Sequence, residues 1–230
     1  MNIVENAKHI MVGTGAGWVL WLLIALSVLS VAIMLERAYV YVTRGEDIDA
    51  LRLRLSKALR AGGFDEARAA MKQSKHPAAA VVLRGMARDA SETSPEEAQE
   101  LMAAESLSQK KSLEVRTSFL GTLGANAPFI GLFGTVIGIL QSFDELGKTA
   151  KAAAPQAGAA AAAAAPQAVM SSLAEALVAT AVGIGVAIPA VFAFNWFQRS
   201  VKQSMTGCEI LSRELLAYLY SDKTPEKGAE

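Results

Sequence analysis

Polar side chains that could hold an ion are rare in the apolar parts of this sequence. Glu175 directly precedes the uncharged run 176–197, and Thr180 lies within that run. A carboxyl group inside a membrane is costly and marks by default a site for a proton or a cation. A helix that begins at Ala168 would carry Glu175 about 10 Å inward, whereas one that begins at Leu173 would leave it as an interfacial acid facing water. Both alternatives stay open.

Two further polar residues stand at membrane depth in the uncharged run 119–143, namely Thr135 and Asn126. We expect Thr135 to offer a hydroxyl to a narrow polar pathway, and Asn126 to hydrogen-bond between subunits. On an ideal helix Thr180 lies about 140° round from Glu175. One helix can therefore turn both side chains toward the same channel only if that channel has a wide lumen or the helix rotates against its neighbours.

Small residues form a stripe along the run 119–143, in alternating steps of three and four that describe one helix face. The stripe consists of Gly121, Gly124, Pro128, Gly131, Thr135, Gly138 and Ser142. The third run carries a second small face, made of Ala176, Thr180, Gly183 and Ala187. Small residues let helices approach closely in lipid, so a helix-packing seam is the plain interpretation. The alternative is a wall against which another helix moves.

Three segments are long and apolar enough to cross a bilayer, namely 18–35, 119–143 and 169–197. A signal peptide does not explain the first, because it starts late and ends in Glu36–Arg37 without a cleavage site. Interfacial aromatic residues lie near the ends of these segments, as Trp18, Trp21, Tyr39, Tyr41 and Trp196. The sequence predicts an all-α integral membrane protein with three transmembrane helices, long cytoplasmic helical extensions and a homo-oligomeric ring.

Lys and Arg set the expected orientation, because they gather after the first segment, before the second and after the third. The N-terminus is then external (periplasmic) and the C-terminus cytoplasmic. The remaining parts are a periplasmic N-terminal amphipathic segment (1–17), a cytoplasmic helical domain (36–118), a periplasmic Ala/Pro-rich loop (144–168) and a cytoplasmic C-terminal helix and tail (198–230).

The cytoplasmic segment is expected to be helical, with interruptions at Gly62–Gly63 and at His76–Pro77. Ser94 has the signature of a helix N-cap, with Pro at the next position and Glu97 three residues on. No helix breaker follows before Gly121, so this helix is expected to run straight into the second span.

The composition excludes several classes of function. Lys and Arg number 22, as do Asp and Glu, so no basic surplus points to nucleic acid. The single cysteine, Cys208, excludes an internal disulfide, and two distant histidines offer no ligand spacing. We expect no metal, no cofactor and no enzymatic activity.

The block that begins at Asn126 and continues Ala-Pro-Phe-Ile-Gly-Leu-Phe-Gly-Thr-Val, and the block Glu175-Ala-Leu-Val-Ala-Thr-Ala-Val-Gly, resemble the ExbB/TolQ/MotA family of ion-driven motor proteins. Three spans resemble its ExbB/TolQ branch. The resemblance implies a homo-pentamer in the bacterial inner membrane around a single-span ExbD/TolR-like dimer, with a TonB/TolA-like arm beyond. It also implies that Thr135, Glu175 and Thr180 line the proton pathway, while the proton-binding Asp lies on the partner.

The function implied is conversion of the proton motive force into work on a periplasmic or outer-membrane process, with TonB-dependent-type transport favoured. The alternatives are TolQ-like envelope maintenance, a gliding motor subunit, or a structural membrane scaffold without ion flux.

Overall fold

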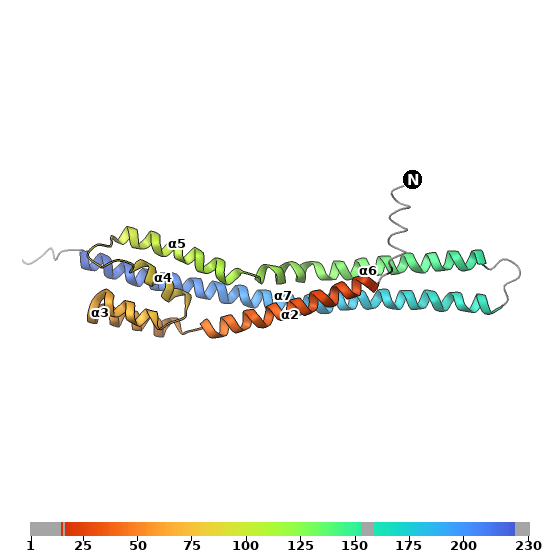
Figure 1. Ribbon diagram of the computed structural model, residues 1–230, viewed down its shortest axis with the longest axis horizontal. Coiled ribbons are helices and arrows are strands. Elements are labelled where there is room, and N and C mark those ends of the chain that lie inside the picture. The colour runs from red at the N-terminus through yellow and green to blue at the C-terminus, as the bar shows by residue number, and fades with distance from the viewer. Residues whose placement is uncertain (1–14, 16, 153–158, 224–230) are drawn as a thin grey trace, which may run out of the picture. The chain divides into compact units, whose positions relative to one another are not determined.

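The computed structural model describes residue 15 and residues 17–152 and 159–223, and in these its regular secondary structure is entirely α-helical (Figure 1). Residues 1–14 and 16 of the expected amphipathic segment 1–17, residues 153–158 of the segment 144–168, and the tail beyond 223 lie outside the described residues. The helices are α2 (Gly17–Arg44), α3 (Ile48–Lys72), α4 (Pro77–Gly85), α5 (Pro95–Glu114), α6 (Thr117–Ala152) and α7 (Ala159–Lys223).

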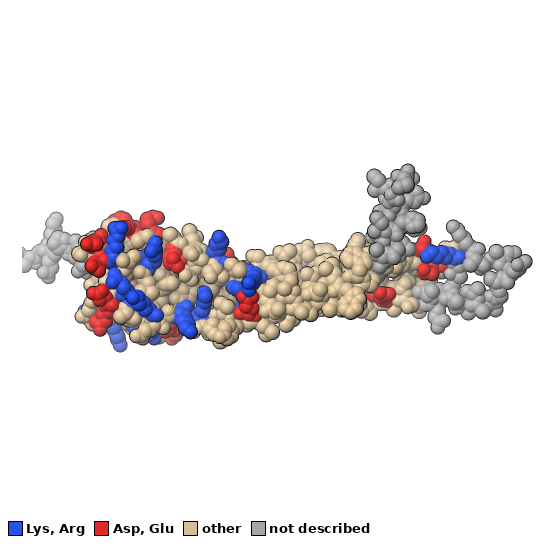
Figure 2. Space-filling model, viewed as in Figure 1, with Lys and Arg blue, Asp and Glu red and all other residues tan. Residues whose placement is uncertain are grey.

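The chain divides into two compact units. The first unit comprises Met1–Met34 and Ser118–Phe194, and the second comprises Leu35–Thr117 and Asn195–Glu230. Among the described residues three helices, α2, α6 and α7, are long and apolar enough to cross a membrane. Figure 2 shows the first unit almost bare of charged side chains, whereas both signs of charge cover the second.

In the first unit the three apolar helices lie side by side around a small core (Figure 1). The Trp18 ring meets the Phe133 ring edge-on, with centroids 6.3 Å apart, which packs α2 on α6. The buried core residues are Val19, Leu23, Leu123, Ala127, Ile137, Val186, Ala187 and Ala190.

Both α6 and α7 extend into the segment 144–168, which the sequence assigned to a low-complexity external loop. Helix α6 continues to Ala152, and α7 already begins at Ala159. Alanine has the highest intrinsic helix propensity, and an alanine run that prolongs an existing helix avoids the cost of nucleation. The described part of this segment is therefore helical on both sides of residues 153–158.

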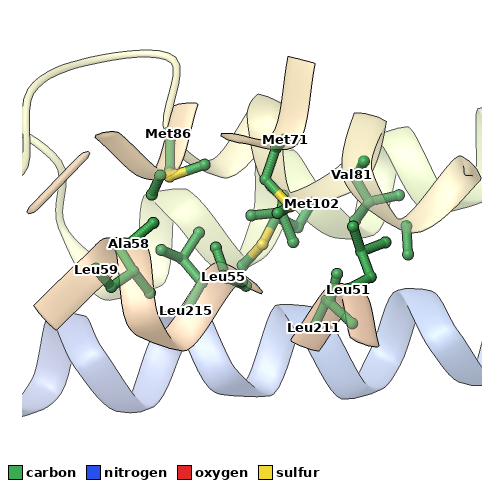
Figure 3. Packing of buried hydrophobic residues seen from close by; sticks show 14 of the residues in the cluster. Leu51, Leu55, Ala58, Leu59, Met71, Val81, Met86, Met102, Leu211 and Leu215 are labelled. Atoms are coloured by element: carbon green, nitrogen blue, oxygen red, sulfur yellow. The ribbon is translucent and has the colours of Figure 1, made fainter. Parts of the chain in front are cut away.

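The second unit packs α3, α4 and α5 against the C-terminal part of α7 around a core rich in leucine and methionine (Figure 3). Leu55, Met102 and Leu215 come from three different helices and point toward one another. Gly63 interrupts α3 at φ 66° and ψ −146°, a conformation that only glycine adopts readily. The expected interruption at Gly62–Gly63 is confirmed.

Side chains cap the starts of α4 and α5, and of these two caps the sequence predicted Ser94. The Ser94 hydroxyl accepts a hydrogen bond from the Glu97 backbone N–H at 3.0 Å. The His76 Nδ1 atom accepts one from the Ala78 backbone N–H at 3.1 Å, and His76 is the N-cap of α4.

The expectation that the helix from Ser94 runs unbroken into the second span is wrong. Helix α5 ends at Glu114, and Arg116 takes the left-handed conformation at φ 65° before α6 begins at Thr117. The free carbonyl of Glu114 accepts a hydrogen bond from the Thr117 hydroxyl at 2.7 Å.

Distant residues of α2 complete this break. The Tyr41 hydroxyl donates to the Leu113 carbonyl at 3.0 Å, and the buried Arg37 guanidinium reaches the Ser112 carbonyl at 3.5 Å. The last carbonyls of a helix need partners from outside it. Here α2 supplies them, so the break depends on tertiary contacts that local sequence does not reveal.

We expect the second unit to lose stability in mild acid through His76. Burial is the main cause that lowers the pKa of His76 below its usual 6.5, against the opposing charge of Glu46. The native state then binds the proton less readily than the unfolded chain does. The stabilisation is complete above pH 6.5 and disappears as the pH falls through the lowered pKa.

His76→Asn keeps an N-cap acceptor without a titrating ring. Its melting temperature in detergent, followed by circular dichroism, should depend less on pH between about pH 7 and pH 5 than that of the wild type. The other histidine, His9, is present in both proteins, so its titration contributes equally to the two pH slopes. Equal pH slopes for the two proteins would remove His76 as the cause.

Candidate functional site

The site is built on the contact between α6 and α7, where the backbones approach so closely that only glycine fits. A Cβ atom on Gly131 would lie 2.8 Å from the Ala179 carbonyl oxygen, and one on Gly183 would lie 2.7 Å from that of Ala127. Backbone atoms cannot move aside as a flexible side chain can. Helices in lipid associate through such small-residue contacts.

These contacts fix an antiparallel register between the two helices. Gly138 lies against Ala176, Gly131 against Gly183, and Gly124 against Val191. Residue numbers that face each other therefore add up to about 314 or 315. By this register Thr135 lies at the same level as Thr180.

The small stripe thus lies in a seam within one chain. Gly121 faces the Phe194 ring, and the Ser142 and Ser172 hydroxyl oxygens are 2.6 Å apart across the seam. Pro128 is half-buried, and the facing residues Ala176 and Ala187 are buried. Large side chains at the glycines would separate α6 from α7.

Thr180 differs from the other hydroxyl residues of the site. Its Oγ1 atom is buried and has no hydrogen-bond partner within the described residues. The Thr135 hydroxyl donates instead to the Leu132 carbonyl of its own helix at 2.7 Å. A buried polar group without a partner is costly in an apolar medium. Thr180 is therefore a polar group of the seam that the described part of the chain leaves without a hydrogen-bond partner.

Glu175 is exposed and lies beside the start of α2, with its Oε1 atom 3.4 Å from the Cβ position of Gly17. Within the part of the chain that the structure describes, neither a hydrogen bond nor an ion pair joins it to another side chain. The register sets Glu175 level with residues 139–140 of α6. Asp144 lies about five residues, or roughly 7 Å, further along the helix axis. Glu175 is thus on the apolar side of the charges at 144–148.

The structure does not bring all of the predicted site residues together. Glu175 makes no contact with the Thr180 hydroxyl, in keeping with their separation around α7. The Asn126 side chain donates to the Thr122 carbonyl of its own helix at 2.7 Å and is exposed.

Sequence reasoning missed one residue of the seam, Gly134. A Cβ atom there would lie 2.9 Å from the Ala179 Cβ atom and 3.3 Å from a methyl group of Val19. Gly134 is three residues after Gly131, so the spacing that defined the stripe could have identified it. It is the point where α2 joins the contact between α6 and α7.

No group of three His, Cys, Asp or Glu residues in the described ranges is placed to hold a metal ion. The charged residues near the C-terminal end of α6 pair with each other, as Lys148 does with Asp144 at 2.8 Å. The chemistry that this arrangement can offer is that of hydroxyl groups and one carboxylate in an apolar surrounding.

Comparison with known proteins identifies the family of this arrangement. The family model described as the MotA/TolQ/ExbB proton channel family matches residues 73–210, well over half of the chain. The chain belongs to the MotA/TolQ/ExbB proton channel family. The matched range includes Thr135, Glu175 and Thr180 and every residue of the glycine seam.

Curated members of the MotA/TolQ/ExbB family are moderately similar to the chain. It is 39% identical over 89 residues to the Tol-Pal system protein TolQ of Pseudomonas aeruginosa, covering 39% of this chain and 33% of that protein. It is 35% identical over 141 residues to the biopolymer transport protein ExbB of Neisseria gonorrhoeae, covering 55% and 58%. For the ExbB of Pseudomonas putida the identity is 43% over 120 residues, covering 52% and 32%. The chain thus spans less than two thirds of the length of each of these relatives.

A substitution pair on α7 tests the seam of this family member. Gly183→Ala places a Cβ atom against backbone and should cost about 1–3 kcal/mol of stability by forcing α6 and α7 apart. Gly185→Ala, two residues on, is the matched control, because a Cβ atom there meets nothing within 4 Å. It should be neutral or stabilising by up to about 1 kcal/mol through helix propensity. Thermal unfolding in detergent measures both, and equal losses would contradict the seam.

Proposed function

We propose that this chain is a proton-channel subunit that converts the proton motive force into mechanical work together with a single-span ExbD/TolR-like partner. Membership of a proton channel family supports the proton as the transported ion. The names of the ExbB and TolQ relatives, a biopolymer transport protein and a Tol-Pal system protein, support the kind of work.

The observation that carries the proposal is the unsatisfied Thr180 hydroxyl, buried at the level of Thr135 between apolar helices. In lipid a polar group must find its partner in protein or in enclosed water. The runs 119–143 and 176–197 contain no charged residue. A proton that passes this level therefore needs an acid from another chain, which the single-span partner would supply.

In this proposal each polar residue has a separate role. Glu175, on the apolar side of the outer charges, attracts protons or a partner cation at the external mouth. Thr180 and Thr135 hold a water or the partner's carboxyl group at one level further in. Each charge that crosses provides about 2.3 kcal/mol per 100 mV, and this is the energy available for mechanical work.

The proposed assembly is a homo-pentamer in the bacterial inner membrane, with the N-terminus periplasmic and the C-terminus cytoplasmic. Large apolar side chains are exposed on all three apolar helices of the single chain, among them Val28 on α2, Phe129 on α6 and Phe192 on α7. In this assembly the leucine-rich α2 contacts lipid, and the exposed side chains of α6 and α7 contact neighbouring copies. The lumen then encloses the partner dimer.

The process that is driven is proposed to be TonB-dependent-type transport, through a TonB-like arm, as the ExbB relatives suggest. The similarity to TolQ equally suits envelope maintenance through a TolA-like arm. None of the relatives named above supports a gliding motor or a scaffold without ion flux.

Proton flux into vesicles that contain the chain and its partner tests Glu175. Glu175→Ala should abolish driven work and reduce flux without dispersing the assembly. Glu175→Asp should keep part of both, because the charge survives on a shorter side chain. Thr180→Val, which removes the unsatisfied hydroxyl at nearly the same volume, should impair flux.

Glu145→Ala is the matched control, since it removes a carboxylate beyond the apolar run. Its flux should equal that of the wild type. If Glu175→Ala conducts and drives work normally while the assembly is intact, Glu175 is only an interfacial acid and the path depends on the partner alone.

Cross-linking tests the arrangement of the helices in the assembly. Single cysteines are introduced in a Cys208→Ser background, which removes the native thiol. Cysteines at exposed positions of α6 and α7, such as Phe129 and Phe192, should join neighbouring copies. A cysteine at Val28 of α2 should react with a lipid-soluble reagent instead, and cross-links confined to α2 would contradict the arrangement.

A further inference from the structure

The second unit contains a pocket of about 760 Å³ between the last turn of α2, the start of α3 and the middle of α7. Its apolar walls include Tyr41, Val42, Leu113 and Trp196. The Tyr41 ring stacks on the Phe197 ring, with centroids 5.3 Å apart, which holds one wall in place. None of the expected proton-pathway residues lines this pocket.

The sequence places this pocket where two apolar runs give way to charged residues. The run 18–35 has ended two turns before Tyr41, and Trp196 stands at the end of the run 176–197. Tyrosine and tryptophan gather at such membrane–water boundaries. Trp196 is 46% exposed and Val42 is 72% exposed, so an apolar surface continues to the rim of the pocket.

Three cationic side chains, Arg44, Arg199 and Lys202, line the pocket. Within the described ranges no ion pair joins Arg44, Arg199 or Lys202 to a carboxylate, although other arginines of the same unit are paired. Arg44 is half-buried, so its charge is partly removed from water. Guanidinium and ammonium groups at a membrane boundary recognise phosphate.

The pocket also contains carboxylates, and these restrict what a phosphate-bearing ligand can be. Glu46 is already paired with Arg54 at 3.0 Å. Asp47 caps α3 by accepting the Asp49 backbone N–H at 3.0 Å, and neither aspartate has an ion pair in the described part of the chain. A purely anionic headgroup would satisfy the cations but lie against these two aspartates. A headgroup with both signs of charge satisfies both sets.

We infer that this pocket binds a phospholipid whose headgroup carries a phosphate and a primary ammonium. Arg44, Arg199 and Lys202 hold the phosphate, and the two aspartates accept hydrogen bonds from the ammonium. An acyl chain lies along Trp196 and the exposed apolar surface beside it. The inference requires that the apolar helices lie in a membrane, but it does not require proton transport.

Tryptophan fluorescence can detect this lipid directly. The chain has three tryptophans, so Trp18→Phe with Trp21→Phe leaves Trp196 alone. The full chain is reconstituted in phosphatidylcholine vesicles, and an acyl-brominated lipid is added at one fixed mole fraction. Brominated phosphatidylethanolamine should bind beside Trp196 about fivefold more tightly than brominated phosphatidylglycerol or phosphatidylcholine, as expected for one additional hydrogen bond from its ammonium to an aspartate. Phosphatidylcholine tests the hydrogen bonds, because its ammonium has no N–H donor.

Variants separate the two halves of the headgroup site. Arg199→Gln or Lys202→Gln should weaken binding of phosphatidylethanolamine and of phosphatidylglycerol by about fivefold each. Asp49→Asn should remove the preference for phosphatidylethanolamine over phosphatidylglycerol. Lys57→Gln, an exposed lysine of the same unit outside the pocket, is the control and should change nothing.

A second single-tryptophan chain, retaining only Trp18 in the first unit, reports general contact with lipid and should show no headgroup preference. Equal quenching of Trp196 by all three lipids would overturn the inference. So would quenching of Trp18 but not of Trp196, because protein from a second copy would then fill the pocket. Glu175→Ala should leave the preference intact, so this result is independent of the proton-flux result.

Discussion

The close approach of α6 and α7 is the interaction on which the first unit depends. Lipid tails are as apolar as the helices, so hydrophobic burial gives little force for association within the bilayer. Packing must supply it, and packing is best where backbones touch. Gly131 and Gly183 make that possible, because a Cβ atom at either would enter the opposite backbone. The same contacts fix the register and hence the levels of Thr135, Thr180 and Glu175.

Close packing also explains why some hydroxyl groups of the seam have a hydrogen-bond partner and another does not, within the described residues. Where the seam ends, Ser142 and Ser172 satisfy each other across it at 2.6 Å. Beside Thr180 the α6 helix presents Gly131, whose Cβ position would lie 3.0 Å from the Thr180 Cα atom, and among the described residues the Thr180 hydroxyl has no hydrogen-bond partner. The seam that holds the helices together therefore leaves the buried Thr180 hydroxyl without a partner in the part of the chain that the structure describes. The exposed carboxylate of Glu175 lies outside the seam, beside the start of α2.

Local sequence was sufficient for features that depend on local chemistry. It predicted the three apolar helices, the kink at Gly62–Gly63 and the N-cap Ser94, because spacing, glycine and capping each act within a few residues. It did not reveal the break at Arg116. The groups that satisfy the end of α5, Arg37 and Tyr41, come from more than 70 residues away. The level of Glu175 likewise follows only from the register of α6 against α7.

Tyr41 connects the features of the second unit that sequence alone did not predict. Its hydroxyl donates to the Leu113 carbonyl at the end of α5, while its ring stacks on Phe197 of α7. Both Tyr41 and Leu113 line the large pocket. A ligand in that pocket would therefore contact the residue that completes the helix break. A ligand that displaced Tyr41 would remove the hydrogen-bond donor of the Leu113 carbonyl. Binding in the pocket is thus coupled through Tyr41 to the geometry of the chain where α5 ends.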